Sequence, residues 1–183
     1  LILAIIIYTS LQAFGQRSRA VTIASIPAKG MVLTNGWKYK TGDDLNWAKP
    51  EYDDTDWQSI EPTKEIAVLP QIFDNQIKWL RITLNVKNPI SKTVGIAVNQ
   101  AGASEIYLNG RLIHRFGNID AEGKKVIAFD PLEIPILLPL DSASYYTLAV
   151  RYSLQPDIAY TGIYGLTKNS FFKATLVDLV PTL

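Results

Sequence analysis

Residues 79–86, WLRITLNV, alternate between aliphatic side chains and aromatic or polar ones. Successive side chains of a strand point to opposite faces, so this period of two predicts a strand with one buried face. The positions predicted to be buried are Leu80, Ile82, Leu84 and Val86, and those on the opposite face are Trp79, Arg81, Thr83 and Asn85. Such a strand needs a second layer to cover its aliphatic face.

Further strands are predicted on either side of a hairpin. Residues 93–100 and 145–154 alternate in the same way, and residues 104–117 read as two strands around Asn109-Gly110. Asparagine and glycine tolerate the positive φ angles that a two-residue hairpin turn requires. We therefore predict a tight hairpin at this pair.

Two C-terminal segments complete the predicted sheets. Residues 124–140 contain three prolines, which restrict them to an edge strand or a surface loop, and residues 169–180 can close a sheet. Short strands without long amphipathic helices predict an all-β fold, an antiparallel β-sandwich of the jelly-roll type.

The N-terminus has the features of an export signal. Residues 1–16 are a nearly unbroken apolar run in which Ala13 and Gly15 lie at positions minus three and minus one before Gln16. We predict a signal peptide over residues 1–16, a linker and first strand over 17–32, and the β-sandwich over 33–183. The protein is then periplasmic or extracellular, and the alternative of an N-terminal membrane anchor also places the domain outside the cytoplasm.

Charge and reactive side chains narrow the function classes. The 183 residues carry 18 Lys and Arg against 17 Asp and Glu, so we expect no nucleic-acid partner. The chain has no cysteine and a single histidine, His114, which excludes disulfides and the usual zinc ligand sets. It also lacks a glycine-rich phosphate loop and a nucleophile elbow. We therefore expect no catalytic residue, no metal site and no cofactor, with the exception of the calcium alternative considered next.

Two acidic turns are the remaining places for chemistry. Asp43-Asp44 and the group Asp53, Asp54 and Asp56 lie among turn-forming residues. Aspartates in such settings cap backbone amides. Calcium binding through hard oxygen ligands and acid–base catalysis by a carboxylate pair are the open alternatives. We expect capping.

Aromatic rings and guanidinium groups form the candidate ligand site. Sugar rings stack on aromatic side chains, and arginine donates paired hydrogen bonds to hydroxyl or carboxylate groups. We expect strand residues to line a groove and the loops around residues 41–57 and 117–135 to close over a ligand. The predicted ligand-binding residues are Trp79, Arg81, Tyr107, Arg151, Trp47 and Asp44.

Structural roles compete with ligand binding at several of these positions. Trp37 and Trp57 are expected to fill the core or to seal its ends. Arg81 can equally pair with an aspartate of the 53–56 turn as a buried clasp, and the residues alone leave these two roles open.

Five segments follow one another in an informative order: GWKYKTGD (36–43), PEYDDTDWQSIEP (50–62), WLRITLNV (79–86), ASEIYLNGRLI (103–113) and YTLAVRYS (146–153). Over residues 33–180 this order resembles the galactose-binding-like jelly roll, as in the sugar-binding domain of family-two glycoside hydrolases. Within that superfamily, residues 36–57 and 107–120 are similar to periplasmic sensor domains of bacterial seven-transmembrane receptors and sensor kinases.

The resemblance implies a non-catalytic module with a carbohydrate or other small polar ligand. Our main hypothesis is an extracytoplasmic sensor module of a larger membrane receptor, with its output across the membrane. The alternative is the accessory sugar-binding domain of an exported family-two glycoside hydrolase. A third hypothesis is a structural or adhesive module that binds protein through an edge strand.

Overall fold

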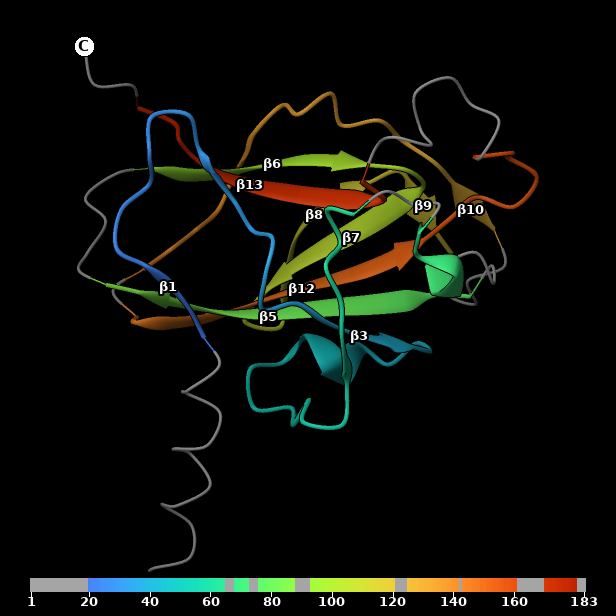
Figure 1. The fold of residues 1–183 in the computed structure, drawn as a ribbon, viewed down its shortest axis with the longest axis horizontal. Helices are drawn as coiled ribbons and strands as arrows, with labels where there is room; N and C mark the ends of the chain where they lie inside the picture. The colour runs from blue at the N-terminus through green and yellow to red at the C-terminus, as the bar shows by residue number, and fades with distance from the viewer. Residues whose placement is uncertain are drawn as a thin grey trace, which may run out of the picture.

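The computed structural model describes residues 20–64, 68–72, 76–87, 93–120, 125–141, 143–160 and 170–180. In this part of the chain two sheets lie one above the other (Figure 1). The predicted antiparallel β-sandwich is therefore confirmed. The predicted signal peptide, residues 1–16, lies outside the described residues.

The larger sheet has seven strands. Its order is β4 (Gln58–Ser59), β3 (Lys38–Thr41), β5 (Lys78–Val86), β12 (Tyr145–Ser153), β7 (Ala103–Leu108) and β8 (Arg111–Phe116). A short strand, β1 (Val21–Ile23), pairs in parallel with the end of β5, and the other pairings in this sheet are antiparallel. The two longest strands, β5 and β12, lie side by side at its centre.

The smaller sheet has the order β11 (Ile136–Leu137), β6 (Val94–Gln100), β13 (Phe172–Asp178) and β2 (Met31–Val32). The segment predicted to close a sheet forms β13, which is an inner strand of this sheet between β6 and β2. The proline-rich segment contributes β11 at the edge and a two-residue strand, β10 (Val126–Ile127), that pairs with β9 (Asn118–Ile119). Its predicted role as edge strand and surface loop is confirmed. Residues 20–32, expected as linker and first strand, supply one strand to each sheet.

The predicted hairpin joins β7 to β8. Asn109 has φ 48° and Gly110 has φ 81°, so both residues adopt the left-handed conformation expected for this turn. Glycine meets this requirement without the steric cost of a Cβ atom.

The main core lies between the sheets, where the aliphatic residues predicted on β5 are buried. They pack with side chains of the smaller sheet such as Ile96 and Leu176. Trp37 is 1% exposed, its Nε1 donates to the Leu33 carbonyl over 2.7 Å, and its ring meets Phe172 edge-on. The expected core role of Trp37 is confirmed. A fully buried side chain of this size contributes about 2 to 3 kcal/mol through the hydrophobic effect.

A third layer covers the outer face of the larger sheet. It consists of residues 42–57, which include the 3-10 helix η1 (Leu45–Ala48) and lie on the opposite side of the sheet from β6 and β13 (Figure 1). Trp57 is buried there, together with Trp79 and Tyr107, in a second apolar cluster. The large sheet is therefore covered on both faces over much of its width. A second 3-10 helix, η3 (Pro70–Ile72), precedes β5. No helix in the described part of the chain has the length and apolar content needed to span a bilayer.

Candidate functional site

Two rows of side chains cross the outer face of the larger sheet. Strand pairing aligns the first row, which consists of Lys40, Trp79, Arg151, Glu105 and Arg115. The second row consists of Lys38, Arg81, Ala149, Tyr107 and Leu112. The structure therefore brings four of the predicted site residues together on one face, as the alternation in the sequence required.

These four residues are buried. The exposed fraction is 0% for Trp79, 2% for Arg81, 4% for Arg151 and 7% for Tyr107. The prediction that they line an open groove is wrong, because residues 42–57 and the β9–β10 pair cover them. Their predicted role in ligand binding stays a prediction. In this conformation the side chains of Trp79, Arg81 and Arg151 are hydrogen-bonded to the covering segments.

The side chain of Arg81 binds the covering segment, residues 42–57, mainly at backbone carbonyl oxygens of that segment. Its Nε donates to Asp54 Oδ2 over 3.0 Å, and Nη1 donates to the carbonyl oxygens of Trp47 and Lys49. Nη2 donates to the Tyr52 carbonyl over 3.3 Å. A guanidinium group has five N–H donors in a fixed plane, which suits convergent acceptors of this kind. The buried clasp with an aspartate of the 53–56 turn, one of the two roles left open for Arg81, is present.

Aromatic rings surround the Arg81 guanidinium. Its central carbon lies 5.6 Å from the centre of the Tyr52 ring and 5.8 Å from that of Trp57, distances at which a cation is attracted to a ring face. Asp54 also pairs with a second cation, because Lys38 Nζ lies 2.7 Å from its Oδ1. Trp57 Nε1 is buried and has no hydrogen-bond partner in the described part of the chain. Packing therefore holds the Trp57 ring, while its backbone N–H donates to the Asp54 carbonyl over 3.1 Å.

Arg151 holds the start of the same covering segment. Its Nε and Nη2 donate to the two carboxylate oxygens of Asp43 over 2.8 and 2.6 Å. It also donates to the carbonyl oxygens of Ile119 and Asp120, at 3.3 and 3.0 Å. Burial disfavours the charge on Arg151, but the hydrogen bonds and the charge of Asp43, together with the charge of Glu105, outweigh it and raise the pKa of Arg151. Arg151 therefore stays a cation and joins two covering segments to β12.

Glu105 completes the first row. It accepts a hydrogen bond from the Tyr107 hydroxyl over 2.8 Å and pairs with Arg115 Nε at 2.9 Å. Burial, followed by the hydrogen bond and charge of Glu105, raises the pKa of Tyr107 well above its ordinary value. Tyr107 therefore remains a hydrogen-bond donor to Glu105 over the physiological pH range.

Of the two predicted loop residues, Trp47 lies in η1 and Asp44 directly precedes it. Trp47 is half-buried and meets Trp57 edge-on, with ring centres 5.2 Å apart. Asp44 is the N-cap of η1, where its Oδ1 accepts from the backbone N–H of Asn46 over 2.9 Å. The expectation of capping is confirmed at Asp44, and also at Asp53, which accepts from the Thr55 N–H.

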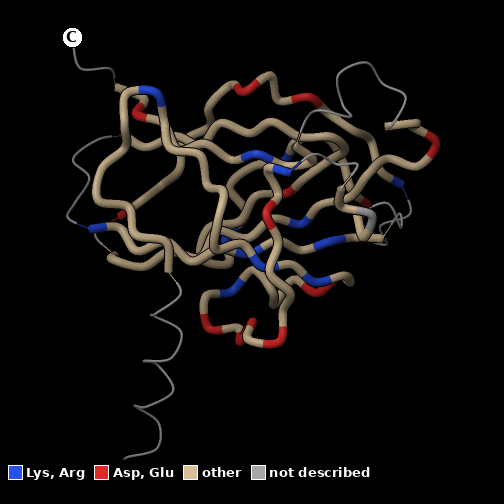
Figure 2. Tube along the Cα trace, in the orientation of Figure 1, with Lys and Arg blue, Asp and Glu red and all other residues tan. Residues whose placement is uncertain are grey.

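The acidic residues of the covering segment lie opposite basic residues of the sheet (Figure 2). Besides the pairs of Asp43 and Asp54, Asp56 pairs with Lys40 at 2.8 Å. In the described ranges, no three carboxylate or imidazole side chains are grouped in a way that would hold a metal ion. The calcium alternative therefore receives no support from the described residues.

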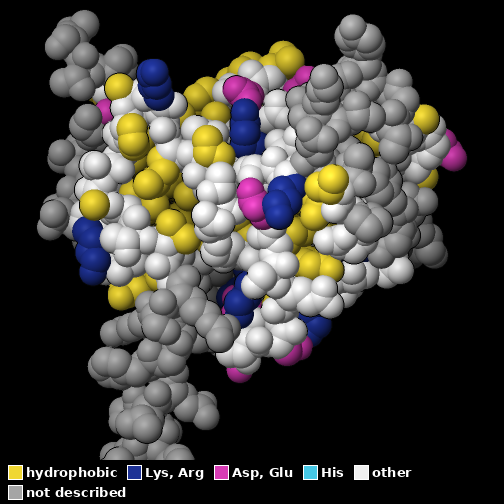
Figure 3. Space-filling view, in the orientation of Figure 1, with side chains coloured by type: hydrophobic (Ala, Val, Ile, Leu, Met, Phe, Trp, Pro, Cys, Tyr) yellow, Lys and Arg dark blue, Asp and Glu magenta, His cyan; other side chains and the backbone are white. Residues whose placement is uncertain are grey.

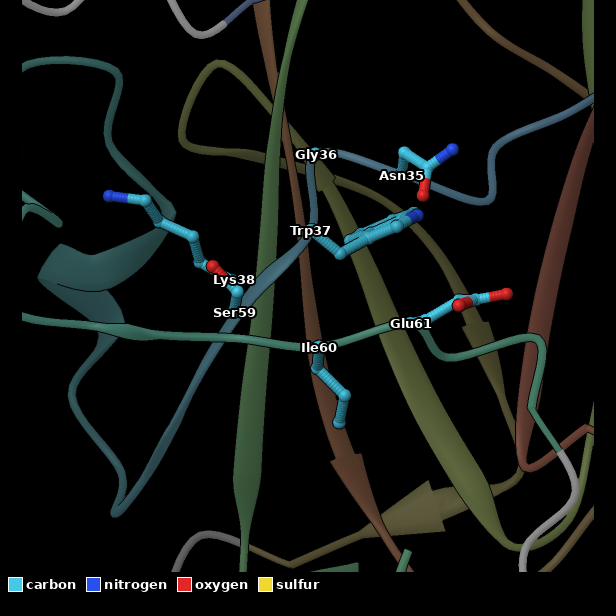
Figure 4. A pocket seen from close by; sticks show the side chains of 7 residues that line it. All are labelled: Asn35, Gly36, Trp37, Lys38, Ser59, Ile60 and Glu61. Carbon is cyan, nitrogen blue, oxygen red and sulfur yellow. The ribbon is translucent and has the colours of Figure 1, made fainter. Parts of the chain in front are cut away.

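An open pocket of about 600 Å³ lies at the edge of the larger sheet, where β3 and β4 pair. Its lining residues are Asn35, Gly36, Trp37, Lys38, Ser59, Ile60 and Glu61. In the close view Asn35, Trp37 and Glu61 extend to one side and Lys38 to the other (Figure 4). The face drawn in Figure 3 carries separate groups of apolar side chains with charged ones between them. Sequence reasoning missed this pocket because residues 35–38 and 59–61 meet only through strand pairing.

No family model and no curated protein matches this chain. Among solved structures, it is similar to β-glucuronidase 2 of Bacteroides uniformis bound covalently to cyclophellitol-6-carboxylate aziridine, with 19% identity and a TM-score of 0.50. The shared feature is the fold. The likeness covers 80% of this chain and 17% of that protein.

Two further structures are β-glucuronidases with TM-scores below 0.5. One belongs to glycoside hydrolase family 2, with 16% identity, a TM-score of 0.47 and coverage of 84% of this chain and 18% of that one. The other, from Bifidobacterium dentium in complex with coumarin-3-O-glucuronide, has 10% identity and a TM-score of 0.48 and covers 87% of this chain and 32% of that one. The expected likeness to receptor sensor domains finds no support in these structures.

Proposed function

We propose that this chain is a non-catalytic β-sandwich module that binds carbohydrate within a longer protein related to glycoside hydrolases. The observation that carries the non-catalytic part of the proposal is that the acidic residues of the two turns already have structural partners. Each of them has a structural partner on the sheet or in its own turn. The proposal includes the export to the periplasm or cell exterior that residues 1–16 lead us to expect.

The carboxylates are arranged for structure. Glycosidases use two carboxyl groups that flank the scissile bond, one of which is a general acid with a raised pKa. Asp43 is held by Arg151 and Asp54 by Arg81. The hydrogen bond from Lys40 lowers the pKa of Asp56, which is the opposite of the shift that a general acid needs. These contacts favour a supporting or binding role over a hydrolytic one.

The carbohydrate ligand is inferred from the fold likeness. Bacteroides uniformis β-glucuronidase 2 carries a covalently bound carboxylated cyclophellitol aziridine, and the part similar to this chain is 17% of its length. A fold shared at this level is an analogy for function. It favours an accessory module of a carbohydrate-active protein over the sensor module, which no described contact favours. The link to a membrane receptor stays a prediction from the sequence.

The test is to titrate the purified chain with methyl glycosides by isothermal titration calorimetry and to assay it with chromogenic p-nitrophenyl glycosides. We expect saccharide binding with Kd on the order of 1 mM, equivalent to about −4 kcal/mol, and no release of nitrophenol. Sorbitol, an open-chain polyol, is the control ligand. Absence of saccharide binding at several times this concentration would overturn the binding role, and enzymatic turnover would overturn the non-catalytic one.

A further inference from the structure

The pocket at the edge of the larger sheet is preformed by backbone hydrogen bonds. Lys38 and Ser59 are paired residues of β3 and β4, and the Ile60 N–H donates to the Trp37 carbonyl over 3.1 Å. The Trp37 ring is fixed by its own hydrogen bond to Leu33. A ligand entering this pocket therefore meets walls that are already ordered, which lowers the entropic cost of binding.

The polar side chains of the pocket are available to a ligand. Asn35 and Ser59 are exposed, and their side chains have no hydrogen-bond partner in the described part of the chain. The Glu61 side chain is 41% exposed. Among the described residues its carboxylate contacts only two side chains, exposed Lys64 and Thr63, each at 3.4 Å. Exposed pairs of this kind contribute little and separate easily.

The lysine in the wall of the pocket is held by Asp54, which is not one of the lining residues. Lys38 Nζ lies 2.7 Å from Asp54 Oδ1 and donates to the Asp54 carbonyl over 2.5 Å. Its side chain extends away from Asn35 and Glu61 (Figure 4). Glu61 is therefore the charged lining side chain that lies on the same side of the pocket as Asn35 and Trp37.

These groups define a ligand class. An amide, a hydroxyl and a carboxylate together offer both donors and acceptors, which match the vicinal hydroxyl groups of a sugar ring. A ligand carboxylate would meet the like charge of Glu61. We propose that this pocket is the carbohydrate site of the module and that it takes a neutral sugar ring in preference to a uronate. The inference rests on the proposed function, because it assumes a carbohydrate ligand.

The test compares pairs of ligands that differ only at C6. The purified chain is titrated with methyl β-D-glucopyranoside and methyl β-D-glucuronide, and with the corresponding galactoside and galacturonide, by calorimetry and by ¹H–¹⁵N correlation spectra. We expect the neutral member of at least one pair to bind about tenfold more tightly. Asn35→Ala should weaken binding of the neutral glycoside about fivefold.

Glu61→Gln tests the charge argument. This variant should bind the uronate more tightly and so narrow the difference within each pair, because it removes the repulsion and keeps the shape of the side chain. Glu133→Gln is the matched control, since Glu133 is an exposed carboxylate on the loop before β11 that pairs with Lys173. The control should bind both ligands as the wild type does.

The outcomes separate this inference from the proposed function. Saccharide binding that is unchanged in both Asn35→Ala and Glu61→Gln would overturn the pocket assignment and leave the binding function in place. Equal binding of glucoside and glucuronide by the wild type would overturn the preference for neutral rings. Failure of every glycoside to bind would remove the proposed function, and with it this inference.

Discussion

Arg151 and Asp43 are 108 residues apart in the sequence and form a two-pronged ion pair with N···O distances of 2.8 and 2.6 Å. The pair joins the centre of the larger sheet to the first residues of the covering segment. Because Trp79 Nε1 also donates to Asp43 Oδ1 over 3.1 Å, one carboxylate satisfies donors on two neighbouring strands. This contact explains why the aromatic and arginine side chains of the face are covered.

Replacing Asp43 with Asn should destabilise the protein by about 2 to 3 kcal/mol. The change leaves the Arg151 charge buried with one anionic partner fewer and weakens both prongs of the pair. Urea denaturation followed by circular dichroism measures the effect. Asp56→Asn, which removes an exposed pair with Lys40, is the control and should cost much less. Equal effects of the two changes would contradict the structural role assigned to Asp43.

Arg81→Lys should loosen the covering segment selectively. A lysine ammonium cannot reach the carbonyl oxygens of Trp47, Lys49 and Tyr52 together with Asp54, because it lacks the planar fork of donors. We expect faster amide hydrogen exchange and new protease cleavage within residues 45–56, with exchange in β6 and β13 unchanged. Uniform loss of protection in both sheets would instead indicate that Arg81 supports the whole fold.

A substitution in the turn at residues 131–134 should stabilise the protein. Leu132 and Glu133 have φ values of 54° and 55°, a conformation that costs a leucine roughly 1 kcal/mol, and Leu132 is 71% exposed. Leu132→Asn should raise stability by about 0.5 to 1 kcal/mol, since asparagine adopts this conformation more readily. Ile134→Asn at an exposed position without positive φ is the control, and thermal melts should show no gain for it.

Comparing Gly102→Ala with Gly110→Ala distinguishes the cost of a steric clash from the cost of a positive φ angle alone. Both glycines have positive φ, 86° and 81°. A Cβ at Gly102 would clash with the Ser153 carbonyl oxygen, whereas the atom closest to a Cβ at Gly110 is 3.4 Å away. We expect losses of more than about 2 kcal/mol at Gly102 and about 1 kcal/mol at Gly110 by chemical denaturation. A larger loss at Gly110 would be inconsistent with this geometry.

Stability should fall at alkaline pH through Tyr146. Burial, with the hydrogen bond to Asp141, raises the pKa of Tyr146 from 10.0 to about 12. Because the folded state holds the proton more tightly, this contribution is complete below pH 10 and is lost as the pH rises to about 12. Tyr146→Phe should make the decline in unfolding free energy shallower over this range, by up to about 1.4 kcal/mol per pH unit. An unchanged slope would contradict the role of this hydroxyl.

The sheet faces could be predicted from sequence because alternation is a local property. The aliphatic residues Leu80 and Ile82 lie in the core, and Trp79 and Arg81 share the opposite face, as their spacing requires. The hairpin was predictable for the same reason, since Asn109 and Gly110 determine the turn by their own backbone preferences.

The burial of that opposite face could not be predicted in the same way. It depends on the pairing of Asp43 with Arg151, and no local pattern indicates which aspartate of two acidic turns reaches which arginine. The edge pocket is a similar case, because Asn35 and Glu61 become neighbours only when β3 pairs with β4. The sequence therefore indicated which residues lie on this face, but their partners depend on contacts between distant segments.

The hydrogen bonds from the Arg81 side chain to backbone carbonyl groups affect how the sequence of the covering segment can vary. Since the guanidinium binds main-chain oxygens of Trp47, Lys49 and Tyr52, the side chain at a position such as Lys49 is free to change without loss of the anchor. Homologues can then retain this outer layer even where few of its amino acids are conserved. The signature to seek in them is an arginine on a central strand with a carboxylate some thirty residues before it, rather than any conserved loop motif.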